Sequence, residues 1–133
     1  MRNIKRNLIL GYSRGSNKWR GLADALESID QETTVVTSDF DNIDGTYDQV
    51  WTMAESLLPL QAELEKKYGI DNLSEQAADI LSDKKKMDDF CVDKGLEYLI
   101  PKSIIAKSSS DLDVFKDTAF IVKPVVGSGC KKN

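Results

Sequence analysis

The sequence predicts an α/β fold, in which a parallel, doubly wound sheet is flanked by helices. Short apolar or β-branched runs occur at 7–12 (NLILGY), 33–37 (TTVVT) and 49–53 (QVWTM), as expected of strands buried in such a sheet. Segments with the apolar spacing of a helix follow the first and third runs. The resulting order of strand, helix, strand, strand and helix is typical of the opening of a parallel sheet.

Each helix of this first half has recognisable ends. Ser16 can cap the first helix, whose inner face is expected to hold Trp19, Leu22, Ala23, Leu26 and Ile29. The segment 39–48 (DFDNIDGTYD) predicts a loop. Pro59 fits the first turn of the second helix, which we expect to end near Gly69. Its predicted inner face consists of Leu57, Leu60, Leu64 and Tyr68.

The second half predicts shorter elements. We expect a helix over 74–81 capped by Ser74, and a helix over 82–94 with Ser82 or Asp83 as its cap and Gly95 as its left-handed stop. The inner face of the latter helix would be Met87, Phe90 and Cys91. The segments KSIIA (102–106) and AFIVKPVV (119–126) predict strands, separated by a short capped helix over 109–116.

Length and composition exclude several classes of protein. The 133 residues match one ordinary domain, and no apolar run approaches the roughly 20 residues of a membrane helix. No small-residue cleavage site follows the short apolar run near the N-terminus, so we expect a cytoplasmic location. The chain contains no histidine, which excludes a Ser-His-Asp triad or a histidine-ligated metal within it. Cys91 and Cys130 lack CxxC spacing and indicate neither a disulfide framework nor a zinc site.

Charge is distributed unevenly along the chain. The net charge of −4 argues against a nucleic-acid-binding protein. Residues 1–20 carry six basic and no acidic side chains, 21–65 carry eleven acidic and no basic ones, and 66–133 carry twelve basic and eleven acidic ones. The acidic block is interpreted as a solvated face, and positive charge is available in the other two segments.

Lys123 is the first candidate for phosphate chemistry, because it lies within the apolar run 120–126. A cation buried in a strand is costly unless an anion, such as a phosphate, meets it. The alternative is a lysine that protects an edge strand from aggregation or reaches water along its stem.

Gly127, Ser128 and Gly129 form the second candidate. Such a loop can turn its N–H groups toward an oxyanion, with the Ser128 hydroxyl as a further donor. An ordinary hairpin turn or a flexible tail would give the same pattern. The loop does not match the Walker consensus, and Gly11 to Gly15 do not match the dinucleotide fingerprint.

Lysines 84–86 open a predicted helix, where cations oppose the helix dipole. A bound polyphosphate would compensate for this unfavourable placement. Pairing on the surface with the nearby Asp83, Asp88 and Asp89 would do so as well.

Taken together, these motifs resemble the N-terminal half of an ATP-grasp enzyme. The resemblance is carried by Asp83-Lys84 opening a helix, by Gly95 and Pro101, and by Lys123-Pro124 ahead of the 127–129 loop. It is weak in the first 50 residues and strongest from residue 77 onward. It implies a Rossmann-like pre-ATP-grasp domain over 1–81, followed by the beginning of an α+β ATP-grasp subdomain over 82–133.

The family implies ATP-dependent ligation, in which a carboxylate is activated as an acyl phosphate and an amine displaces the phosphate. By this resemblance, Lys84 and Lys123 would hold the nucleotide phosphates, and Gly127, Ser128 and Gly129 would cover the β and γ groups. Glu55 resembles an acidic residue that some relatives use to contact the acceptor. An acid favoured at a helix start is the alternative interpretation of Glu55.

Arg14 and Lys18 follow the first strand, at a predicted switch-point crevice, and could meet an anionic substrate. We assign no catalytic or metal-binding residue within the chain. The magnesium ligands, the adenine-binding segment and the catalytic arginine of the family would lie downstream of residue 133. We therefore expect ATP and Mg²⁺ to serve the full-length protein, and this chain alone neither to bind ATP tightly nor to hydrolyse it.

Other functions stay open at this stage. The chain could be a non-catalytic α/β module that binds a small anion or a protein partner, or a redox or regulatory domain that acts through Cys130. The carboxylate, the acceptor and the oligomeric state, including a homodimer, are not indicated by the sequence.

Overall fold

The computed structural model describes residues 4–12 and 18–125 and shows a mixed α/β fold. A three-stranded parallel sheet is formed by β1 (Arg6–Leu10), β2 (Glu32–Val36) and β3 (Gln49–Thr52), in the order β2-β1-β3. The register pairs Leu8 with Thr34 on one side and with Val50 on the other. The three predicted strands of the first half are thus confirmed, each within one or two residues of its predicted bounds.

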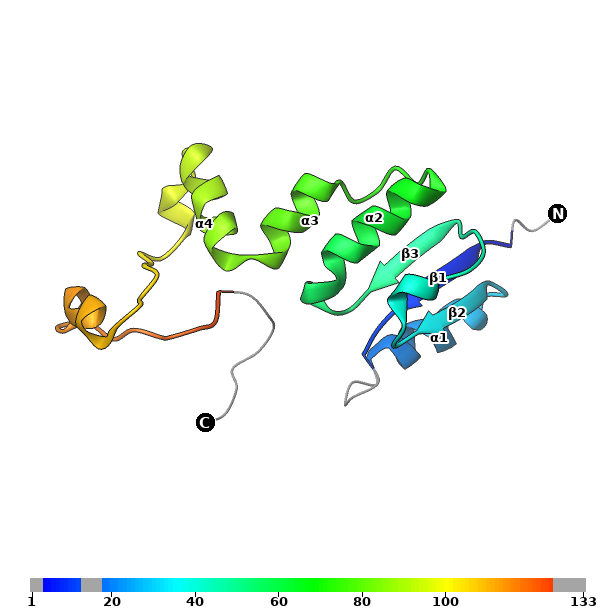
Figure 1. Ribbon diagram of the computed structural model, residues 1–133, viewed down its shortest axis with the longest axis horizontal. Coiled ribbons are helices and arrows are strands. Elements are labelled where there is room, and N and C mark those ends of the chain that lie inside the picture. Colours follow the sequence, from blue (N-terminus) through cyan, green and yellow to red (C-terminus); the bar gives the residue numbers. More distant parts are fainter. Residues whose placement is uncertain (1–3, 13–17, 126–133) are drawn as a thin grey trace.

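Helices cover both faces of the sheet. The helix α2 (Leu58–Tyr68) packs on the face that carries Leu8, Leu10 and Val50. The helix α1 (Lys18–Glu27) contacts β1 and β2, and Ile9, which alternates with Leu8 and Leu10, points to that opposite face. Figure 1 shows the sheet between these helices at one end of an elongated molecule.

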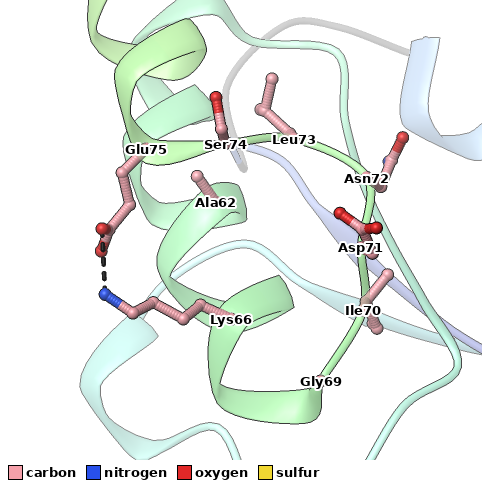
Figure 2. Close-up of a pocket in the computed structure, with 9 residues that line it drawn as sticks. All are labelled: Ala62, Lys66, Gly69, Ile70, Asp71, Asn72, Leu73, Ser74 and Glu75. Atoms are coloured by element: carbon pink, nitrogen blue, oxygen red, sulfur yellow. Dashed lines mark hydrogen bonds and ion pairs between the residues drawn. The ribbon is translucent and has the colours of Figure 1, made fainter.

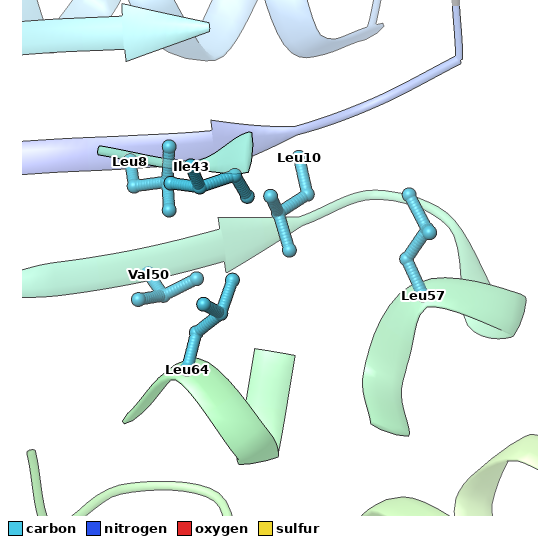
Figure 3. Packing of buried hydrophobic residues seen from close by; sticks show 6 residues of the cluster. All are labelled: Leu8, Leu10, Ile43, Val50, Leu57 and Leu64. Carbon is cyan, nitrogen blue, oxygen red and sulfur yellow. The ribbon is translucent and has the colours of Figure 1, made fainter. Parts of the chain in front are cut away.

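The apolar core lies between the sheet and α2. Its buried members come from two strands, the loop before β3, the turn before α2 and α2 itself; they are Leu8, Leu10, Ile43, Val50, Leu57 and Leu64 (Figure 3). Ile43 lies in the segment predicted as a plain loop, which contains the short 3-10 helix η1 (Phe40–Asn42) and contributes this side chain to the core. The predicted end of α2 is confirmed by Gly69, which has a φ of 70°.

The second half is an arm of helices that leads away from the sheet. Helix α3 (Glu75–Ser82) packs on α2, and α4 (Lys84–Asp93) packs on α3 (Figure 1). Ser74 caps α3 by accepting a 3.1 Å hydrogen bond from the Ala77 amide, as predicted. Asp83 caps α4 by accepting from the amides of Lys85 and Lys86, and Gly95 follows with a φ of 70°.

Four predictions about apolar residues are wrong or only partly right. Residues 102–106 and 119–125 are not strands, because within the described ranges neither forms a hydrogen-bonded ladder with another segment. Ile29 lies beyond the end of α1 and is exposed. Helix α4 has no buried residue, so the expected inner face of Met87, Phe90 and Cys91 is only partly covered. The short helix predicted over 109–116 is present as the 3-10 helix η4 (Ser109–Phe115), capped by Ser108.

Candidate functional site at the carboxyl edge of the sheet

The carboxyl ends of β1 and β3 form the switch point of the sheet. The chain leaves β1 toward β2 on one side, while β3 lies on the other side of β1. In open parallel sheets, ligands bind in the crevice that this reversal creates. The residues that follow Leu10 and Thr52 are therefore the first candidates for a binding site.

Hydrogen bonds hold the two strand ends together. The Thr52 hydroxyl donates to the Leu10 carbonyl at 3.2 Å and accepts from the Ala54 amide at 3.1 Å. The Tyr12 hydroxyl and the Ser56 hydroxyl are 3.0 Å apart. These contacts fix the start of the 3-10 helix η2 (Glu55–Leu57) beside the end of β1.

Glu55 begins η2 and meets a cation from the helical arm. Its Oε2 lies 3.8 Å from Nζ of Lys84, the first residue of α4, and both side chains are about one-third exposed (32% and 39%). Glu55 lies in the first turn, as the helix-start interpretation predicts. Its part in acceptor binding stays a prediction. The pairing of Glu55 with Lys84 was not predicted, because nothing in the spacing of 29 residues indicates it.

The segment that carries Lys123 returns to the same place. The Lys84 amide donates to the Val125 carbonyl at 3.1 Å. This amide is one of the donors that a helix start leaves without a partner inside the helix. Two segments predicted to bind phosphate, about 40 residues apart in sequence, are therefore joined through their backbones. The Lys123 side chain is exposed and belongs to an extended segment without a ladder, so the buried-strand environment predicted for it is wrong.

The other two lysines of the triplet pair on the surface. Lys85 bonds to Asp89 and Lys86 bonds to Asp79 at 2.6 Å. The hydrogen bond to Asp89 raises the pKa of Lys85, and that to Asp79 raises the pKa of Lys86. Surface pairing, the alternative that the sequence left open, is thus confirmed for Lys85 with Asp89. Lys86 instead pairs with Asp79, which was not among the expected partners.

A cavity of about 620 Å³ lies next to Lys123, within the size range of small-molecule sites. Its walls come from α4, η4 and the two extended segments, and its polar residues include Asp88, Lys102 and Lys123. The Ser103 hydroxyl donates to Asp88 and ties one wall to α4.

Some predicted site residues lie outside the described structure. These are Arg14, Gly127, Ser128 and Gly129, and the Lys18 side chain, although Lys18 itself begins α1. Within 4–12 and 18–125, no group of three acidic or cysteine side chains could hold a metal. In the same ranges, no helix has the length and apolar character needed to span a bilayer.

The arrangement defines an α/β protein with polar side chains gathered at the carboxyl edge of its parallel sheet. Comparison of the chain with protein-family models, curated proteins and solved structures gives no match. The polar contacts at this edge and the sequence motifs are therefore the basis for any functional assignment.

Proposed function

We propose that the chain is the N-terminal part of an ATP-dependent ligase of the ATP-grasp type, acting in the cytoplasm. The observation that carries this proposal is the hydrogen bond between the Lys84 amide and the Val125 carbonyl. It brings the helix opened by Asp83-Lys84 next to the segment with Lys123-Pro124, and the sequence resemblance assigns both segments to one nucleotide.

The charges of the described residues fit a polyphosphate. Lys84 lies beside Glu55, which follows β3, and Lys123 lines the cavity between α4, η4 and the extended segments. Phosphoryl transfer depends chiefly on positioning and on neutralisation of charge, both of which lysines can provide. The loop with Gly127, Ser128 and Gly129 would add N–H and hydroxyl donors. The part proposed for this chain in the reaction is to hold and orient phosphates.

The reaction that we propose for the full-length protein has two steps. A substrate carboxylate attacks the γ-phosphorus of ATP, which forms an acyl phosphate and releases ADP. An amine then attacks the acyl carbon, which forms the new carbon-nitrogen bond and releases phosphate. By the sequence resemblance, Glu55, which lies in η2 after β3, would contact the acceptor, and Arg14 and Lys18 stay sequence-based candidates for an anionic substrate.

Nucleotide binding by the polypeptide of the complete open reading frame tests this proposal. Loss of a hydrogen bond from a charged group costs about 1.5–3 kcal/mol, so Lys84→Met should weaken ATP binding by roughly tenfold to a hundredfold. Lys85→Met removes the same charge from a lysine paired with Asp89 and should leave the affinity within about threefold. Equal effects of both changes, or no carboxylate-dependent release of ADP, would refute the ligase.

A second proposal, a non-catalytic binding module, is supported by the exposed apolar side chains of the arm. Ile121 is 76% exposed and Val122 is 70% exposed, and they adjoin the cavity beside Lys123. Contiguous apolar surface of this kind often marks a site for a protein partner. Association with a partner that covers Ile121 and Val122, without any release of ADP, would favour this second proposal.

A further inference from the structure

Glu65 is a fully buried acidic residue that the sequence analysis did not single out. It lies on α2 with 0% of its surface exposed. Its Oε1 accepts from Gln61 Nε2 at 2.9 Å and from Asn72 Nδ2 at 3.0 Å, and its Oε2 accepts from the Leu73 amide at 2.8 Å. A carboxylate is costly to bury unless such donors surround it.

Two of these three donors belong to the loop that joins α2 to α3. Asn72 and Leu73 directly precede Ser74, whose hydroxyl caps α3. Figure 2 shows this loop passing from Gly69 at the end of α2 to Glu75 at the start of α3, and the 3.0 Å ion pair of Lys66 with Glu75 beside it. Glu65 therefore fixes the point from which α3 departs.

From that point, the chain reaches the pair of Lys84 and Glu55 without a flexible connection. Helix α3 ends at Ser82 and α4 begins at Lys84, so Asp83 alone joins them. Asp83 caps α4 through its side chain, and Lys86 of α4 bonds to Asp79 of α3. The direction of α3 thus sets where Lys84 lies relative to Glu55.

Besides the hydrogen bonds of Glu65, packing of small side chains between α2 and α3 could also set the direction of α3. Ala62 of α2 and Ala78 of α3 are both buried where these helices pack. Dispersion contacts between methyl groups are individually small and weakly directional, whereas the three hydrogen bonds of Glu65 require defined donor positions. We propose that Glu65 is a positioning residue, which holds the loop at Asn72 and Leu73 and thereby keeps Lys84 beside Glu55; its importance for ligation rests on the proposed function.

Amide hydrogen exchange of the whole chain carrying Glu65→Gln tests this role. Glutamine keeps the volume but offers one acceptor oxygen and replaces the other with a donor. We expect protection of the Ala78 and Lys84 amides to fall by roughly tenfold to a hundredfold, as for other lost hydrogen bonds to a charged group. The amide of Gly11, which bonds to Val36 in the sheet region, should keep its protection. Glu63→Gln removes the same charge from an exposed position of α2 and should change none of these amides.

Two results would overturn the proposal. An equal loss of protection at Gly11, Ala78 and Lys84 would show that Glu65 contributes only to overall stability. Unchanged protection at Ala78 and Lys84 would show that alanine packing alone places the arm. Should Glu65→Gln fail to fold, Asn72→Ala removes a single donor from an exposed residue, and the same contrast between Gly11 and Lys84 is expected with a smaller loss. No nucleotide enters this experiment, so its outcome is separate from that of the ATP-binding test.

Discussion

The two halves of the molecule both contain capped helices, but only the first half buries many of its side chains. All the buried residues of the described structure lie between Asn7 and Ala78, and none lies within 79–125. The second half nevertheless carries large apolar side chains, among them Tyr98, Ile121 and Val122. Capping and apolar spacing thus form helices in both halves, whereas the core lies on the paired strands, which among residues 4–12 and 18–125 occur only in the first half.

The largest contrast is expected from deleting an apolar side chain in each half. Leu10→Ala removes a fully buried side chain from the core and should lower the free energy of unfolding by about 2–5 kcal/mol. Ile121→Ala shortens a side chain that is 76% exposed and should change the free energy of unfolding by no more than about 0.5 kcal/mol. Urea denaturation of both variants measures the difference. Similar losses would mean that 119–125 is packed as tightly as the sheet.

The next largest effect on stability is expected from replacing either of two glycines that end helices. Gly69 ends α2 and Gly95 follows α4, both have a φ of 70°, and a Cβ would meet no atom within 4 Å at either position. Alanine at each should cost about 1–2 kcal/mol because of the left-handed backbone. We expect Gly69→Ala to lower the global free energy of unfolding.

Gly95→Ala, in contrast, should increase amide exchange in α4 alone, since local regions can open separately from the rest of a protein. Hydrogen exchange of the two variants decides between these outcomes. Loss of protection in β1 upon Gly95→Ala would show that the arm and the sheet unfold as one unit.

Loss of the cap at Asp83 should have a smaller effect, confined to the arm. Its side chain accepts from the Lys85 and Lys86 amides, and removal of such a cap costs about 1 kcal/mol. Asp83→Ala should reduce the helical circular dichroism signal, whereas Asp83→Asn, which retains an acceptor, should largely preserve it. An unchanged signal in the alanine variant would contradict a capping role.

The smallest effect is expected on acidification near η4. Hydrogen bonds from the amides of Lys107 and Ser108 lower the pKa of Asp111 below its ordinary value of 3.8. The stabilisation from this carboxylate is therefore complete above about pH 3.8 and is lost as the pH falls through the lower, folded value. The amide proton shifts of Lys107 and Ser108 should follow this transition, and Asp111→Asn should abolish it. A transition above 3.8 would show that these hydrogen bonds are absent in solution.

Sequence patterns located the strands and helices of the first half because the local preferences of its residues favour the same elements that its tertiary packing stabilises. NLILGY is apolar enough to be buried on both faces, and Gly69 supplies the left-handed stop that α2 needs. KSIIA and AFIVKPVV have the same apolar character. They form no strands in the described structure because a strand requires a neighbouring strand to which its backbone can hydrogen-bond. The composition of a segment does not indicate whether such a neighbour is present.

The sequence indicated the individual residues of the candidate site, but it did not indicate which of them contact one another. Lys84 was found because Asp83 and the lysine triplet mark a helix start. Its contacts with Glu55 and Val125 depend on how α3 leaves α2, and that direction comes from Glu65 and the loop at Asn72. The sequence did contain a clue to Glu65, since Leu57, Leu60 and Leu64 place it beside the inner face of α2.

The two tryptophans of the chain have a practical consequence for spectroscopy. Trp19 packs against Gly11, and Trp51 donates through its indole N–H to Asn7 in the sheet, so both indoles belong to the same half of the molecule. Tryptophan fluorescence will therefore report unfolding of the sheet region and will change little when the arm unfolds. Phe115→Trp would place an indole against the Phe120 ring and so provide a fluorescent probe for unfolding of the arm.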